Sequence, residues 1–278
     1  MGEANTLDKF YTNPDVVDSC LATINLSEYD LAIEPSAGDG AFYNKLMIEK
    51  VGIDIDPGIN NLLRMDYLHA ANLLQSIFEL ELTDNKKILV IGNPPFGKNS
   101  SLAVKFFNHS AKFCDTVAFI VPKTFKKISI QNRLNLNFHL KTEHELPKDS
   151  FHLPNGESYS VPCLWQVWER KPLKREKIKM PLTHEDFAFV DKKEEANFLV
   201  QRVGVSAGAT HKDFNRSESS HYLIKAPDCV YNIMKKIDWT ETSKYHTAGN
   251  PSISKAELIE QYITAKIRDT NGAQKKHP

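Results

Sequence analysis

The chain has 278 residues, of which 41% are hydrophobic and 25% charged, as expected for a globular protein with one large domain or one large domain and a small appendage. Lys plus Arg and Asp plus Glu each number 35, so the net charge before histidine is zero. Overall charge therefore cannot support nucleic-acid binding, which would need a locally basic surface.

Strands and helices are predicted to alternate along the first 170 residues. Short apolar runs predict strands over residues 31–33, 51–56, 62–65, 88–92, 116–121, 137–145 and 163–169. Apolar residues at helical spacing predict helices that begin at Pro14 and that cover residues 41–48, 67–78 and 102–113. This alternation is typical of parallel βαβ units in a doubly wound sheet. We therefore expect an α/β domain over residues 1–170.

The pattern loosens after this domain. Strands are predicted over residues 187–190, 199–203 and 222–224, and helices over residues 230–237 and 254–267. Ser254 and Glu257 have the spacing of a capping box for the last helix. We expect a small α+β extension over residues 171–278, which could recognise a target. Its basic start, residues 170–179, is read equally well as a nucleic-acid contact or as a solvated linker.

The most informative motif is Asn93-Pro94-Pro95-Phe96, directly after the predicted strand 88–92. Ligands of open α/β sheets bind at the carboxyl edge of the strands. Two carbonyl oxygens and an aromatic ring at that edge can hold a planar group that bears an NH2, such as adenine. The two prolines stiffen the loop.

An acid-rich glycine turn, residues 34–40, follows the first predicted strand. Its glycines let a ligand approach the backbone closely, but Tyr43 stands where a dinucleotide fingerprint requires its third glycine. The carboxylates of Glu34 and Asp39 would repel a pyrophosphate and suit a cationic ligand.

Asp54 ends the next strand, within about 20 residues of the turn, where an acid commonly binds ribose hydroxyls. The alternative for this carboxylate is a helix N-cap in the turn that follows it.

Taken in order, these residues resemble the S-adenosylmethionine-dependent N6-adenine methyltransferases that act on nucleic acid. The resemblance covers about residues 8–169 and implies a Rossmann-like fold with a mostly parallel seven-stranded sheet and helices on both faces. It implies S-adenosylmethionine as cofactor, bound by Tyr11, Thr12, Glu34, Ser36, Ala37, Gly38, Gly40, Asp54, Ile55, Asp66 and Asn93.

The resemblance also suggests individual roles within this set. The segment that contains Tyr11 and Thr12 would pack over the methionine end of the cofactor, although Asn13 is an extra residue in it. Ile55 would lie against the adenine ring of the cofactor, and Asp66 would read its amino group.

The same resemblance makes Asn93, Pro94, Pro95 and Phe96 the catalytic motif. The side-chain oxygen of Asn93 and the carbonyl of Pro94 would accept both N–H groups of the target amine and aim its lone pair at the methyl group. Phe96 would stack on a base that has been flipped out of the helix.

The leading hypothesis is therefore a DNA adenine-N6 methyltransferase, with RNA as the second choice of substrate because nothing in the sequence separates ribose from deoxyribose. A protein glutamine methyltransferase and a catalytically silent scaffold that binds nucleic acid remain alternatives. The order of the motifs resembles the gamma arrangement, in which target recognition lies at the C-terminal end.

Metals and membranes are not expected partners. The four cysteines lie far apart and the ten histidines lack metal-ligand spacing. No apolar run approaches the roughly 18 residues of a membrane helix, and the N-terminus has no apolar signal stretch. We expect a reducing compartment, cytoplasm or nucleus.

Overall fold

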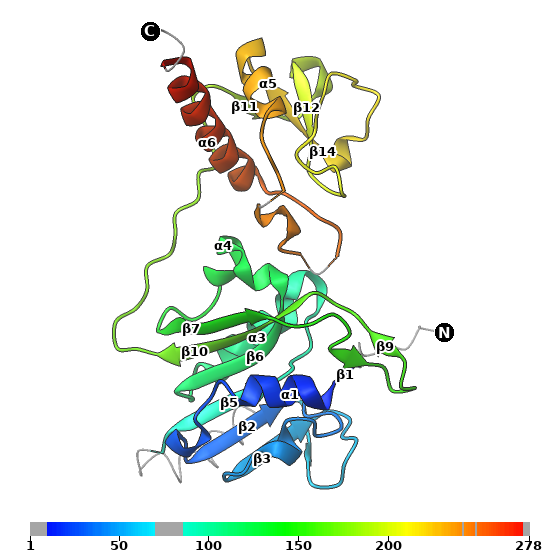
Figure 1. The fold of residues 1–278 in the computed structure, drawn as a ribbon, viewed down its shortest axis with the longest axis vertical. Coiled ribbons are helices and arrows are strands. Elements are labelled where there is room, and N and C mark those ends of the chain that lie inside the picture. Colours follow the sequence, from blue (N-terminus) through cyan, green and yellow to red (C-terminus); the bar gives the residue numbers. More distant parts are fainter. Residues whose placement is uncertain (1–9, 70–85, 241, 248, 275–278) are drawn as a thin grey trace. The chain divides into compact units, whose positions relative to one another are not determined.

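The computed structural model describes residues 10–69, 86–240, 242–247 and 249–274. It divides the chain into two compact units, Met1–Lys177 and Ile178–Pro278 (Figure 1). The boundary lies beyond the expected one at 170/171 because the chain after the last strand of the first unit stays attached to that unit. The backbone N–H of Lys171 donates to the carbonyl of Asn137 at 2.7 Å, and that of Arg175 to the carbonyl of Leu136 at 2.9 Å.

A seven-stranded sheet forms the centre of the first unit, as expected. Its strands are β2 Leu31–Pro35, β3 Lys50–Asp54, β4 Leu63–Arg64, β5 Ile88–Gly92, β6 Thr116–Pro122, β7 Phe138–Glu145 and β10 Cys163–Arg170. Their order is β4-β3-β2-β5-β6-β10-β7, and only β10 runs antiparallel to its neighbours. The predicted strands are thus confirmed, and so is the mostly parallel α/β fold.

Helices cover both faces of this sheet because successive residues of a buried strand point to opposite sides. Among the residues of this unit that the structure describes, the α-helices are α1 Pro14–Leu21, α3 Ser101–Ser110 and α4 Ile128–Gln131. Ile33 of β2 packs in one core cluster with Phe107 of α3. Its neighbour Ala32 packs in a second cluster with Val17 of α1.

One predicted helix, residues 41–48, is wrong. This segment forms only a 3-10 turn, Tyr43–Lys45. Tertiary contacts hold the short form: the carboxylate of Glu34 accepts the backbone N–H of Tyr43 at 2.6 Å, and the ammonium of Lys50 donates to the carbonyls of Tyr43 at 2.7 Å and Leu46 at 2.9 Å. Most of another predicted helix, residues 67–78, lies outside the described residues.

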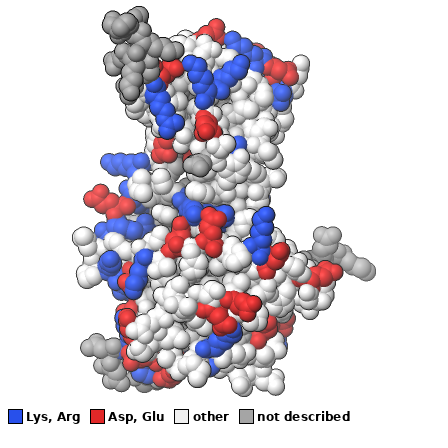
Figure 2. Space-filling model, in the orientation of Figure 1, with Lys and Arg blue, Asp and Glu red and all other residues white. Residues whose placement is uncertain are grey.

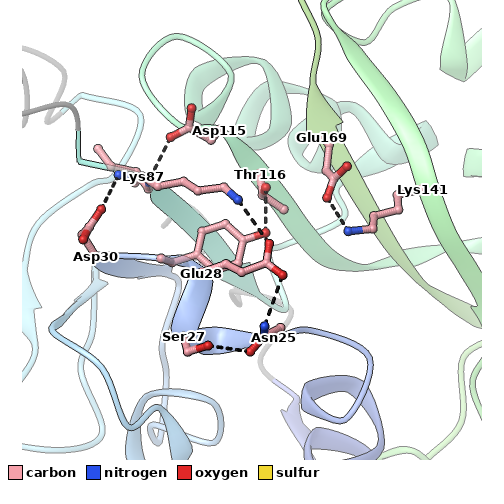
Figure 3. Close-up of polar contacts among 11 residues, drawn as sticks. Asn25, Ser27, Glu28, Asp30, Lys87, Asp115, Thr116, Lys141 and Glu169 are labelled. Carbon is pink, nitrogen blue, oxygen red and sulfur yellow. Dashed lines mark hydrogen bonds and ion pairs between the residues drawn. The ribbon is translucent and has the colours of Figure 1, made fainter.

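Polar side chains secure the amino ends of the strands (Figure 3). Asp30 accepts the backbone N–H of Lys87 at 2.7 Å, and Asp115 accepts that of Ile88 at 2.8 Å. The ammonium of Lys87 also pairs with Glu28 at 3.2 Å. These carboxylates accept backbone N–H groups at the amino ends of the strands, so they serve the fold at the edge opposite the carboxyl ends.

A small antiparallel sheet joins the start of the chain to residues far along it. It consists of β1 Tyr11–Thr12, β8 Phe151–His152 and β9 Ser158–Tyr159, in that order. Asn13 lies at the N-cap position of α1, but its side chain donates to the carbonyl of Asp149 at 2.6 Å and lies 2.7 Å from Nδ1 of His152 instead of capping the helix. The residue that is extra relative to the family pattern therefore anchors β1.

The second unit is an α+β structure with its own core. It contains β11 Ala188–Val190, β12 Phe198–Gln201, β13 Thr210–His211, β14 His221–Lys225, α5 Asp228–Lys235 and α6 Lys255–Gln274. The four strands are ordered β11-β14-β12-β13, and Val200, Ile224, Met234 and Ile259 are among the buried residues of the core. The capping box of α6 is confirmed, since the N–H of Ser254 donates to Glu257 at 2.6 Å and the N–H of Glu257 to Ser254 at 3.2 Å.

Within the described residues, no helix combines the length and the apolar character needed to cross a bilayer.

Candidate active site

A pocket lies where β2, β3 and β5 end, and residues of β1 also line it. This is the carboxyl edge of the sheet, where open α/β folds bind ligands. Of the predicted site residues, the lining includes Tyr11, Thr12, Glu34, Ser36, Ala37, Gly38, Asp54, Ile55, Asn93, Pro94 and Pro95. The lining also includes Asp39, whose carboxylate the sequence had linked to a cationic ligand, and Phe10, Ala41 and Phe42, which were not predicted as site residues.

Three predicted site residues, Gly40, Asp66 and Phe96, do not line the pocket. Gly40, at φ 82°, is required for packing: a Cβ there would lie 2.5 Å from Cδ1 of Ile59. The carboxylate of Asp66 accepts the backbone N–H of Leu68 at 2.9 Å and pairs with Nδ1 of His69 at 2.6 Å. Local contacts thus use both oxygens of Asp66.

Phe96 contacts core residues in place of an open surface. It is partly buried against both core clusters of the first unit, and its ring meets that of Phe10 edge-on at 5.5 Å. The stacking of Phe96 on a base stays a prediction. The aromatic residues that line the pocket are Phe10, Tyr11 and Phe42.

The glycine turn is shaped by contacts from β3 and β1. The carboxylate of Asp54 accepts the N–H of Gly38 at 2.8 Å with one oxygen and that of Asp56 at 2.7 Å with the other. No helix lies in the described residues between Asp54 and β4, so Asp54 is not a helix N-cap; it closes a local turn, and its remaining lone pairs can still accept hydroxyl groups. Gly38 has a φ of 54°, and a Cβ there would lie 3.0 Å from the ring of Tyr11, so the absent side chain lets Tyr11 lie on the turn.

The charges of the pocket are acidic. Among the described residues, the lining carries the carboxylates of Glu34, Asp39 and Asp54 and no Lys or Arg. Glu34 is 2% exposed, and burial raises its pKa well above the ordinary value. Burial also raises the pKa of Asp39, while nearby His152 opposes that change. A bound cation would relieve this accumulation of acids, whereas a polyphosphate would add to it.

Asn93 has one end of its side-chain amide satisfied and the other unpaired. Its Nδ2 donates to the hydroxyl oxygen of Thr12 at 3.2 Å. Its Oδ1 is buried and has no hydrogen-bond partner. Buried polar atoms are nearly always paired, so an unpaired acceptor in a pocket points to a donor that arrives with a ligand.

The lysines near this edge are neutralised. Lys123 and Lys126 pair with Glu145 of β7 at 2.6 and 3.1 Å. Figure 2 shows acidic and basic side chains intermixed on the visible face of the molecule. The required basic surface is therefore not provided by these two residues.

Comparison with known proteins gives one related sequence. No family model matches the chain. The ribosomal RNA small subunit methyltransferase A of Hydrogenobaculum sp. (strain Y04AAS1) is 25% identical over 118 residues, a match that covers 41% of this chain and 46% of that protein. The chain thus aligns with less than half of this relative.

Among solved structures, a protein of Pyrococcus horikoshii provisionally described as an RNA methyltransferase has 15% identity and a TM-score of 0.40, covering 63% of this chain and 90% of that one. The magnesium protoporphyrin IX methyltransferase of Synechocystis PCC 6803 has 13% identity and a TM-score of 0.38, covering 61% and 86%. These TM-scores are too low to support an argument, and the fold is assigned from the strand order instead.

The strand order, the single antiparallel strand and the acidic glycine turn define the fold. The first unit has the Rossmann-like fold of the S-adenosylmethionine-dependent methyltransferases, and the pocket lies at the carboxyl edge of its sheet.

Proposed function

We propose that the chain transfers a methyl group from S-adenosylmethionine to the N6 amino group of adenine in nucleic acid, with DNA as the first substrate to test. The observation that carries the proposal is the buried, unpaired Oδ1 of Asn93 beside a pocket of carboxylates. An acceptor of this kind suits an amine, and the carboxylates suit a cationic cofactor.

The residues present fit S-adenosylmethionine. Its ammonium and sulfonium charges would lie among Glu34, Asp39 and Asp54, and its ribose hydroxyls could donate to Asp54. Ile55 is 53% exposed although it is apolar, and an adenine ring is a suitable cover for it. When bound, the cofactor supplies a methyl group on a positively charged sulfur.

The chain supplies the orientation of the acceptor amine. The exocyclic nitrogen of adenine is a weak nucleophile because its lone pair is delocalised into the ring. Oδ1 of Asn93 and the carbonyl of Pro94 would accept its two N–H groups and localise the lone pair on nitrogen. The new C–N bond then forms as the C–S bond breaks, and the methylated nitrogen loses a proton to water.

Access to this oxygen requires movement. Because water does not reach Oδ1 of Asn93, the amine must displace protein contacts when it enters. The ring of Phe10, which lines the pocket and meets Phe96 edge-on, is the candidate cover.

RNA is the second candidate substrate, and one observation favours it: the matched relative is named for ribosomal RNA. The same amine clamp would serve adenine in either polymer.

The test is incubation of the protein with methyl-labelled S-adenosylmethionine and matched duplex DNA, single-stranded DNA, RNA oligonucleotides and ribosomal RNA, followed by nucleoside analysis. Labelled N6-methyladenine is expected in at least one polymer and none with Asn93→Ala. Label confined to protein would favour the glutamine alternative, and cofactor binding without any transfer would favour the scaffold.

A further inference from the structure

Thr12 is buried and contacts the group proposed to hold the target amine. It is 3% exposed, and its hydroxyl oxygen accepts Nδ2 of Asn93 at 3.2 Å. The two residues are 81 positions apart in sequence. Thr12 also lines the pocket. The family resemblance assigns it only a contact with the cofactor.

The backbone of Thr12 is held from outside the pocket. Its strand β1 pairs with β8, with Thr12 opposite Phe151. The next residue, Asn13, donates its backbone N–H to the carbonyl of Ser150 at 2.9 Å and its side chain to that of Asp149 at 2.6 Å. These contacts fix the backbone of β1 and so keep the hydroxyl of Thr12 beside Asn93.

The amide of Asn93 is useful to an amine in only one orientation. With Nδ2 on Thr12, the unpaired atom is the acceptor Oδ1. With the amide turned over, two N–H donors would face the two N–H groups of the incoming amine. Donors facing donors repel each other and cannot localise the lone pair of the amine.

We propose that Thr12 is a positioning residue: its hydroxyl oxygen accepts Nδ2 of Asn93 and so holds this side chain in place, with Oδ1 left for the target amine. This inference rests on the proposed function for its consequence, but the contact itself can be tested without any reaction. The competing possibility is that Thr12 acts only as a contact of the cofactor.

The contact is tested by NMR of the full chain with ¹⁵N-labelled asparagine. The side-chain NH2 pair of Asn93 is identified by its loss in Asn93→Ala. In Thr12→Val, which keeps the shape and removes the oxygen, the hydrogen-bonded proton of this pair should shift upfield. It should stay in place in Thr12→Ser, and in Thr142→Val, the same substitution on β7 outside the pocket. An unchanged pair in Thr12→Val overturns the proposal.

The consequence is tested by steady-state kinetics. Thr12→Val should lower kcat about 10- to 100-fold, the loss expected for one hydrogen bond that orients a reacting group, while the KM for the cofactor stays within about threefold. Thr12→Ser should restore kcat. A raised cofactor KM with unchanged kcat would assign Thr12 to the cofactor alone. Thr12→Ala repeats both measurements if the valine variant folds poorly.

The two measurements separate the two proposals. If the wild-type protein transfers no methyl group to adenine, the proposed function fails, and the NMR comparison still decides whether Thr12 positions Asn93.

Discussion

Asn93→Ala should abolish most of the methyl transfer while leaving the fold intact. The substitution removes Oδ1, the acceptor proposed to hold the target amine, and leaves the carboxylates that would hold the cofactor. Removing one preorganised hydrogen-bonding group of a transition state typically lowers kcat by about 10²–10³, or about 3–4 kcal/mol. Cofactor affinity should change little, because the lost atom serves the amine.

The effect on stability follows from the two ends of the amide. Loss of the bond from Nδ2 to Thr12 costs about 0.5–1.5 kcal/mol, and loss of a buried unpaired acceptor returns about 1–3 kcal/mol. The free energy of unfolding of Asn93→Ala should therefore lie between about 0.5 kcal/mol below and about 2.5 kcal/mol above that of the wild type. Asn93 should therefore be a residue that activity requires and that contributes little to, or lowers, the stability of the fold.

The assay combines methyl transfer under saturating cofactor with urea unfolding of the same preparations. Asn93→Asp keeps acceptor oxygens and should lose less activity than Asn93→Ala. Asn232→Ala, an exposed asparagine on α5, is the matched control and should change neither measurement. Unchanged kcat, or a loss of more than about 3 kcal/mol in stability, would refute this reasoning and make Asn93 a structural residue.

Three further predictions concern the pocket and the second unit. Burial raises the pKa of Glu34, so the folded protein holds this proton more tightly than the unfolded chain does. The resulting contribution to the free energy of unfolding is fully present below the ordinary pKa of 4.5 and is lost as pH rises through the pKa of the folded state. Glu34→Gln should thus gain melting temperature over wild type as pH rises, and a constant difference would contradict the pKa direction. Truncation of Ile55 to alanine should weaken cofactor affinity about tenfold by calorimetry, whereas Met47→Ala, at 87% exposure and outside the pocket, should leave it unchanged. Gly208→Ala should destabilise the second unit by at least about 2 kcal/mol, because φ is 97° and a Cβ would lie 2.3 Å from the ring nitrogen of Trp239; Gly249→Ala meets no atom within 4 Å and should be neutral by urea unfolding.

Local patterns in the sequence were sufficient to predict the seven strands of the central sheet. The apolar run before Asn93 is buried along all of β5, and the prolines that follow it end the strand where the pattern predicts. The helix predicted over residues 41–48 failed for the opposite reason. Its helical periodicity was outweighed by contacts from Glu34 and Lys50, which belong to neighbouring strands and are invisible to a local pattern.

The candidate site shows the same division. The glycine turn, Asp54 and Asn93 could be predicted because each directly follows a strand, and the ends of parallel strands meet at one edge. Phe96 and Asp66 also follow their strands, yet side-chain packing in one case and a local pair with His69 in the other keep them out of the pocket lining. Position in the sequence places a residue at an edge, but rotamer and neighbours decide what it faces.

The sequence by itself determined the order of the central strands along the chain, the edge at which the pocket lies and the acidic character of its lining, because these depend on periodicity and on residues adjacent to strand ends. Only the tertiary structure decided which atoms meet. The bond between Asn93 and Thr12 spans 81 positions and that between Asn13 and His152 spans 139, and such pairs arise from packing of distant segments. The unpaired oxygen of Asn93, from which the function is inferred, is visible only after those segments have been brought together.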